Sequence, residues 1–204
     1  MDFLNALILL LNYIFVPALA YGSQLAIGAI FVTLIYGILR FANFATGDMM
    51  SFGTMVAILF TWYFQSLGLS LGFLPTALLA IPFAILFTGL YMLVIDKFVF
   101  KYYRLNKSPP VQLAMVSIGV MFVTQAVVRI IIGPSDRRFF DGEKFLIKAN
   151  EFKEMTGLNE GLAIKSTQVI TIVVTIILVS TLFWFLNKTK TGKSMRAYSD
   201  NEDL

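Results

Sequence analysis

Two long apolar blocks of the chain meet at the stretch GILRFANFATGD, residues 37–48. Half of this stretch is glycine, polar or charged, namely Gly37, Arg40, Asn43, Thr46, Gly47 and Asp48. Non-helical backbone near membrane depth is tolerated where protein buries it or where it lines a cavity. The stretch therefore predicts either an ordinary tight turn, with Asp48 as the cap of the next helix, or a functional segment that borders a path through the membrane.

The composition of the chain indicates a membrane protein. Of its 204 residues, 58% are hydrophobic and 14% are charged, and the mean hydropathy is +0.79. Soluble domains are about 45–50% apolar and about 25% charged. Cysteine and histidine are both absent, which excludes disulfides, thiolate or imidazole metal ligands, and Cys or His nucleophiles. We therefore expect no enzyme activity, no cofactor and no metal site.

Six apolar blocks are long enough to cross a bilayer, which takes about 20 residues for each helix. Their approximate limits are 3–20, 22–39, 48–67, 73–95, 111–133 and 167–186. None alternates as a porin strand does over about ten residues, and apolar residues cover every face. The sequence predicts an all-α fold, a polytopic transmembrane helical bundle of about six spans that forms a single domain over 1–204 and contacts membrane lipid.

The positions of lysine and arginine orient these spans, because cytoplasmic loops are enriched in both. Basic residues gather in 96–107, with Lys97, Lys101, Arg104 and Lys107, and after residue 186, with Lys188, Lys190, Lys193 and Arg196. The segment 134–165 balances six basic against six acidic residues. We expect 96–107 and 187–204 to be cytoplasmic, the loop 134–165 to be external and, by counting back, the N-terminus to be cytoplasmic. The net charge of +4 then marks a membrane side and indicates no nucleic acid partner.

The first apolar block has two interpretations. Ala18-Leu19-Ala20 has the form of a signal-peptidase site, but the preceding residues include Asp2 and no Lys or Arg, which favours an uncleaved span. Pro17 and Gly22 suit a very short connection between the first two spans, or a kink.

The fifth block carries a polar stripe. Ser117 and Thr124 lie seven residues apart on one helical face, and Gln125 and Arg129 lie four apart on an adjacent one. Two interpretations remain open: hydrogen bonding between helices with Arg129 anchored at the interface, or the lining of a solute path. The middle of each span lacks an acidic residue, which argues against a proton-coupled pump.

One nucleotide-binding motif is incomplete. Gly192-Lys193-Ser194 has the form of the end of a phosphate-binding loop, but Asn187 stands where that loop needs a glycine, and no strand precedes it. We therefore expect that this chain does not hydrolyse ATP.

Several separated motifs resemble the permease subunits of branched-chain amino acid ABC importers, the LivH-like family. The matching residues are Tyr36-Gly37, Asn43-Phe44-Ala45, Gly47-Asp48, Gly53, Ile118-Gly119, Gln125, Val128-Arg129, Gly133-Pro134, the run from Thr191 to Ala197, and Asp200. The likeness runs from about Gly22 to the last residue. Thr46 stands where the family usually has a histidine, and relatives continue through further spans, so the chain is expected to be an incomplete product.

The resemblance implies a subunit of an importer in the bacterial inner membrane. Its partners would be ABC ATPase subunits, a second permease subunit and a periplasmic solute-binding protein. The solute would be Leu, Ile or Val, or alternatively urea or a short-chain amide; an ion-coupled secondary transporter or channel and a structural membrane anchor remain the other classes. Candidate residues of the solute path are Asn43, Thr46, Asp48, Ser117, Thr124 and Gln125. The segment 187–204 would begin the ATPase-coupling region, with Gly192, Lys193, Met195, Arg196 and Asp200; a solvated positive tail is the alternative.

Overall fold

The computed structural model describes residues 2–69, 71–72, 74–138 and 144–200. The chain divides into two compact units, one formed by Met1–Ile38 with Gly142–Leu204 and the other by Leu39–Asp141. Within the described residues both units are helical except for one small pair of strands, which confirms the all-α class.

The first unit is built on a long N-terminal helix and its neighbour α8. Its elements are α1 (Asp2–Leu10), the π-helix η1 (Leu11–Phe15), α2 (Val16–Leu39), β1 (Phe145–Ile147), α7 (Ala149–Thr156), β2 (Ile164–Lys165), α8 (Ser166–Lys188) and α9 (Lys190–Asp200). The strands β1 and β2 pair antiparallel. Ile27, Ile30 and Phe31 of α2 line an apolar groove with Leu178, Val179 and Leu182 of α8.

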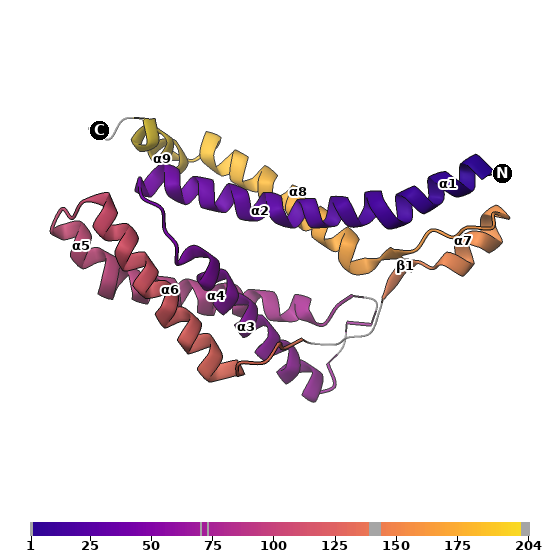
Figure 1. Cartoon of the computed structure of the whole chain (residues 1–204), viewed down its shortest axis with the longest axis horizontal. Helices are drawn as coiled ribbons and strands as arrows, with labels where there is room; N and C mark the ends of the chain where they lie inside the picture. Colours follow the sequence, from indigo (N-terminus) through magenta and orange to yellow (C-terminus); the bar gives the residue numbers. More distant parts are fainter. Residues whose placement is uncertain (1, 70, 73, 139–143, 201–204) are drawn as a thin grey trace. The chain divides into compact units, whose positions relative to one another are not determined.

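The first two predicted spans form one continuous helix, Phe3–Leu39, 37 residues long (Figure 1). The predicted separation into two spans is therefore wrong. The physical reason lies just before Pro17, whose ring cannot supply an amide to the preceding turn. There the helix widens into the π-turn η1, in which the Val16 amide donates to the carbonyl of Leu11, five residues back. Such a turn accommodates the proline without ending the helix.

Asn12 fastens this long helix to the segment that precedes α8. Its side-chain nitrogen donates to the carbonyl of Gly161 at 3.5 Å, and its side-chain oxygen accepts the Ala163 amide at 3.2 Å. The N-terminal end of the helix therefore lies beside the polar segment predicted to be external.

The second unit contains α3 (Thr46–Ser66), α4 (Ala77–Ile95), the π-helix η2 (Asp96–Phe100), α5 (Lys101–Leu105) and α6 (Pro110–Ile132). α3 packs against both α4 and α6. Its buried side chains are Thr46, Met49, Met55, Val56, Ile58 and Thr61. α3 is therefore the central helix of this unit.

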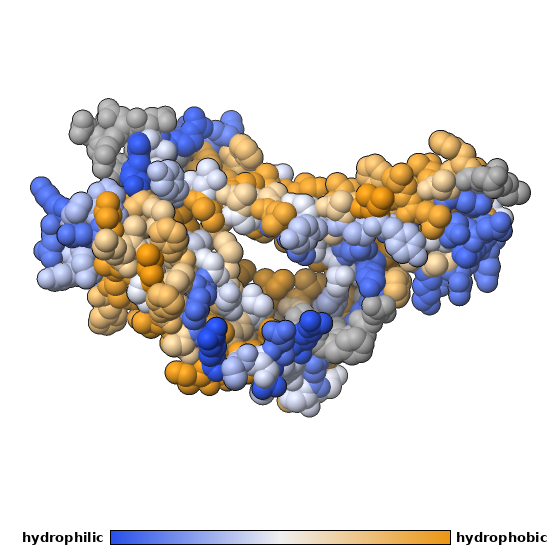
Figure 2. Space-filling model, viewed as in Figure 1, coloured by the Kyte–Doolittle hydropathy of each residue, from blue (hydrophilic) through white to orange (hydrophobic). Residues whose placement is uncertain are grey.

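Among the described residues, four helices are long and apolar enough to span a membrane: Phe3–Leu39, Ala77–Leu105, Pro110–Ile132 and Ser166–Lys188. α3 has the length of a span but carries more polar residues, which suits a helix enclosed by protein better than one facing lipid. Hydrophobic side chains cover the long N-terminal helix, whereas hydrophilic ones gather over α5 and α7 (Figures 1 and 2). The chain is thus a multi-pass membrane protein.

Candidate functional site

The turn that follows α2 is non-helical for only a few residues. Arg40 directly follows the last helical residue and has a φ of 58°, in the left-handed region. That position after a helix is usually a glycine, and a non-glycine residue there costs about 1–2 kcal/mol. Arg40 therefore ends α2 at a cost in conformational energy, which packing and hydrogen bonds of the residues that follow offset.

Asn43 shapes the turn through its own side chain. Its oxygen Oδ1 accepts the amide of Ala45 at 3.1 Å, and its carbonyl accepts the amide of Thr46 at 3.3 Å. This local pattern is an Asx-turn, which presents the chain to the first turn of α3. The side chain of Thr46 is buried there, and that of Asn43 is half-buried.

Asp48 is the third residue of α3, not its cap. The residue at the N-cap is Ala45, and no side chain makes a capping hydrogen bond there. The prediction that Asp48 caps the helix is therefore wrong, because α3 begins at Thr46, two residues earlier than the apolar pattern indicates. The carboxylate still lies in the first turn, where the helix dipole favours a negative charge.

Ser117 connects α6 to the turn. Its hydroxyl donates to the carbonyl of Ala114 at 2.7 Å, so its oxygen is the acceptor for the Phe44 amide at 3.0 Å. The side chain is completely buried. The predicted polar stripe and the predicted turn, 73 residues apart, therefore meet at this one hydroxyl.

Thr124 makes the second polar contact of α6. Its hydroxyl donates to the carbonyl of Val120 at 2.8 Å, so the Tyr91 hydroxyl must donate to it across 2.9 Å. The Tyr91 ring stacks on Phe52, with centroids 4.1 Å apart. Sequence reasoning missed Tyr91 and Phe52. The available signal was a tyrosine inside a block that is otherwise almost entirely apolar, because a buried tyrosine hydroxyl needs a partner.

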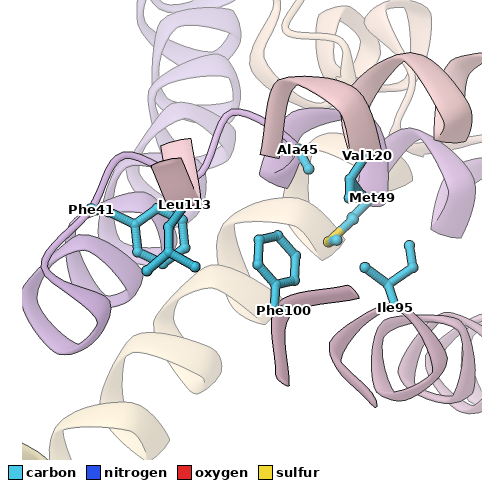
Figure 3. Packing of buried hydrophobic residues seen from close by; sticks show 7 residues of the cluster. All are labelled: Phe41, Ala45, Met49, Ile95, Phe100, Leu113 and Val120. Carbon is cyan, nitrogen blue, oxygen red and sulfur yellow. The ribbon is translucent and has the colours of Figure 1, made fainter. Parts of the chain in front are cut away.

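An apolar cluster lies against the turn. Phe41 and Ala45 from the turn pack with Met49 of α3, and the remaining members are Ile95, Phe100, Leu113 and Val120. The rings of Phe41 and Phe100 are 6.1 Å apart. Figure 3 shows Ile95 and Phe100 directed toward Met49. The turn is thus held by both hydrogen bonds and close packing.

These contacts bear on the two interpretations of the polar stripe. Ser117 and Thr124 are both fully buried and hydrogen-bonded within the unit, as expected for bonding between elements. Asn43, Asp48 and Gln125 are only half-buried. In this conformation the hydroxyls support the turn, and the three half-buried side chains are the more accessible polar groups.

The elbow between α8 and α9 requires a glycine. Thr189 donates its hydroxyl to the carbonyl of Phe185 at 2.7 Å and accepts the Gly192 amide at 3.0 Å, which is the geometry of a helix N-cap. A Cβ at position 192 would lie 2.7 Å from the Cα of Leu186 and would clash with backbone. Gly192 is therefore a residue of close approach between α8 and α9.

The other predicted coupling residues occupy different faces of α9. Lys193 and Arg196 are exposed, and Arg196 donates to the side-chain oxygen of Asn187. Met195 is half-buried, and both it and Arg196 line a pocket of about 210 Å³ with Thr33, Leu34, Gly37 and Ile38 of α2. Met195 thus faces the chain's own helix. The side chain of Asp200 lies outside the described residues.

Comparison with known proteins identifies the family of the chain. Residues 14–204 match the family described as branched-chain amino acid transport system, permease component. No curated protein and no solved structure matches the chain. The family match takes in the turn, α6 and α9, and it identifies a transport permease rather than an enzyme. The chain therefore belongs to the family of permease components of branched-chain amino acid transport systems.

Proposed function

We propose that the chain is a membrane-spanning subunit of an ABC importer in a bacterial inner membrane, driven by ATP hydrolysis in a separate subunit. The observation that carries the proposal is α9, eleven residues that directly follow a candidate span. Gly192, Met195 and Ser199 lie on its covered face, whereas Lys193 and Arg196 are exposed. An amphipathic helix with one face on its own protein and exposed basic side chains suits a docking element for a cytoplasmic partner.

The topology that fits this role has five crossings. The long helix Phe3–Leu39 would run from outside to inside, and α3, α4, α6 and α8 would follow alternately. This order keeps the basic segments 96–107 and 187–204 cytoplasmic and 134–165 external. It also agrees with the bonds of Asn12 to the segment before α8. The N-terminus would then be external.

The solute path would pass the turn after α2. A branched-chain amino acid offers an ammonium group, a carboxylate and an apolar side chain. Asp48 can pair with the ammonium, while Asn43 and Gln125 supply amide donors and acceptors. Thr46, Ser117 and Thr124 are buried and would hold this lining in place. Urea or a short amide would use the amide groups without Asp48.

The partners would divide the work of transport. A periplasmic solute-binding protein would deliver solute at the external side, and a second permease subunit, identical or homologous, would complete the path. Two ABC ATPase subunits would contact α9, since this chain lacks a complete phosphate-binding loop.

The test combines uptake with charge reversal at α9. The full-length transporter, assembled with its ATPase in proteoliposomes, should take up labelled leucine, with competition by isoleucine and valine. Arg196→Glu should lower solute-stimulated ATP hydrolysis at least tenfold. Asn187→Ala removes only the partner of Arg196 within the chain, so it should retain most of the solute-stimulated ATP hydrolysis. Lys148→Glu in the external segment should retain most of this activity too.

Three outcomes would contradict parts of the proposal. Unchanged assembly and hydrolysis in Arg196→Glu would refute the coupling role of α9. Competition by urea or acetamide, without competition by valine, would assign the other solute class. Uptake that survives removal of ATP but collapses with the ion gradient would indicate a secondary transporter.

A further inference from the structure

Three basic residues in η2 and α5, which follow α4, each precede a large apolar or aromatic residue. The pairs are Lys97-Phe98, Lys101-Tyr102 and Arg104-Leu105, which we call the basic–apolar stripe. Phe98 is 74% exposed, Tyr102 64% and Leu105 73%. The residues between these pairs point the other way: Phe100 is buried, and Val99 and Tyr103 pack partly against the cluster at the turn. The stripe therefore occupies one outward side of η2 and α5.

The helix length places this stripe at the bilayer surface. α4 runs for 19 residues without a charged side chain. At about 1.5 Å for each residue it is about 28 Å long, close to the thickness of about 30 Å of the hydrocarbon core. The helix continues without interruption through η2 and α5 to Leu105. The first charged residues after the span, from Asp96 onward, thus begin at the level of the lipid headgroups.

The three basic side chains are not equivalent. Arg104 makes a bidentate pair with Asp96, with N to O distances of 2.6 and 2.8 Å. Lys97 and Lys101 make no salt bridge within the described part of the chain. A lysine next to a span directs its ammonium group toward headgroups while its stem stays on apolar surface, and aromatic rings favour the same depth.

We propose that the basic–apolar stripe is a binding site for an anionic phospholipid. The headgroup phosphate pairs with Lys97 and Lys101, and Phe98, Tyr102 and Leu105 lie at the boundary between headgroup and acyl chains. Charge complementarity favours this occupant, because anionic lipid surfaces attract basic residues next to a span. The inference needs only that α4 crosses the bilayer, and it holds whatever the solute and the ATPase are.

A lipid at this site would support the turn after α2. The same helical segment directs Phe100 inward, where its ring lies 6.1 Å from that of Phe41. A headgroup bound on the outer side therefore restrains η2 and α5 against the cluster that holds the turn. Anionic lipid should raise the melting temperature of the full chain more than zwitterionic lipid does.

The experiment measures lipid retention by the full chain. Native mass spectrometry of the detergent-solubilised protein, titrated with phosphatidylglycerol or phosphatidylcholine, gives an apparent Kd for each lipid. Loss of one lysine near a headgroup corresponds to about a fivefold loss of affinity, so Lys97→Gln with Lys101→Gln should weaken phosphatidylglycerol binding about 30-fold. Lys97→Arg with Lys101→Arg should retain it. Phosphatidylcholine binding should be unaffected by either pair.

A matched control keeps the same net charge change at another cytoplasmic position. Lys188→Gln with Lys190→Gln should leave phosphatidylglycerol binding nearly unchanged; an equal loss there would show a general charge effect and overturn the site. Unchanged binding in the Lys97 and Lys101 variants would also overturn it. If those variants instead lose only assembly with the ATPase, the stripe is a protein interface. If solute uptake fails but phosphatidylglycerol binding depends on Lys97 and Lys101 as described, the transport proposal is contradicted and the lipid site is supported.

Discussion

Single hydroxyl groups hold the site together at the scale of residues. Ser117 accepts the Phe44 amide and Thr124 accepts the Tyr91 hydroxyl, so each satisfies a donor on another element. The sequence shows that such residues are present, but the partner of a backbone amide cannot be read from it. The spacing of Ser117 and Thr124 correctly predicts a shared face, whereas only the fold shows that this face meets Phe44.

Ser117→Ala should destabilise the second unit. The change leaves the Phe44 amide without its acceptor, at a cost of about 1–3 kcal/mol in the free energy of unfolding. Replacing Trp184 by Phe leaves Trp62 of α3 as the single tryptophan. Its fluorescence during an SDS titration then measures the unfolding of the second unit.

The control for that variant is Ser51→Ala. Ser51 is exposed and donates only to the carbonyl of Gly47 within α3, so its loss should stay within about 0.5 kcal/mol. Equal effects of the two substitutions would show that the bond between Ser117 and Phe44 contributes no specific stability.

At the scale of elements, the packing of α3 against α4 depends on how closely their backbones can approach. Gly53 of α3 faces Thr88 of α4, and a Cβ at Gly53 would lie 3.0 Å from Thr88 Oγ1. That hydroxyl oxygen is buried and has no hydrogen-bond partner in the described structure. Small residues at a helix contact let backbones approach closely in membranes. The contact between α3 and α4 thus depends on the absence of a side chain at Gly53.

Gly53→Ala should weaken the contact between α3 and α4 by about 1–3 kcal/mol, because the added methyl overpacks it. Thr88→Ala removes the atom that the methyl meets, so the double variant should recover much of the loss in the same SDS titration. Gly89→Ala on α4 meets no atom within 4 Å and serves as the control. A double variant no more stable than Gly53→Ala would contradict this packing.

Gly192→Ala should displace α9 from α8, since the new Cβ would clash with the backbone of the preceding turn. The chain has no native cysteine, so Thr33→Cys with Met195→Cys can be cross-linked cleanly. These two positions line one pocket, and their cross-linking yield with a short bifunctional maleimide should fall severalfold when Gly192→Ala is added.

Gly28→Ala is the matched control for the displacement of α9, because nothing lies within 4 Å of a Cβ at that position. The same yield in Gly192→Ala as in Gly28→Ala would mean that α9 tolerates a side chain at the elbow.

At the scale of the whole molecule, the sequence predicts helices better than it predicts their connections. The predicted limits 111–133 and 167–186 agree with α6 and α8 to within two residues, because uninterrupted apolar runs dictate both. The predicted break between two spans near Pro17 is wrong, because the helix continues through a π-turn that accommodates the proline. α3 is less apolar than its neighbours, and hydropathy alone does not show that α4 and α6 pack against it. Cross-chain bonds such as that of Asn12 to Ala163 are likewise invisible before folding.

The position of the N-terminus gives a test at this scale. A cysteine at Leu4 should react with a membrane-impermeant maleimide from the outside of intact cells, as should one at Met155 of α7. A cysteine at Lys193 should react only after permeabilisation. If Leu4→Cys instead behaves like Lys193→Cys, the long N-terminal helix does not cross in the proposed direction.

The unbroken helix Phe3–Leu39 has a consequence for the host membrane. Its 37 residues extend about 55 Å, against a hydrocarbon core of about 30 Å. Phe3, Tyr13 and Ile14 are exposed in its N-terminal part. Hydrophobic mismatch of this size favours a steep tilt, local thickening of the bilayer or a protein neighbour that covers the excess. Acyl-chain length is therefore a physical variable for this permease, and longer lipids should relieve the mismatch that shorter ones increase.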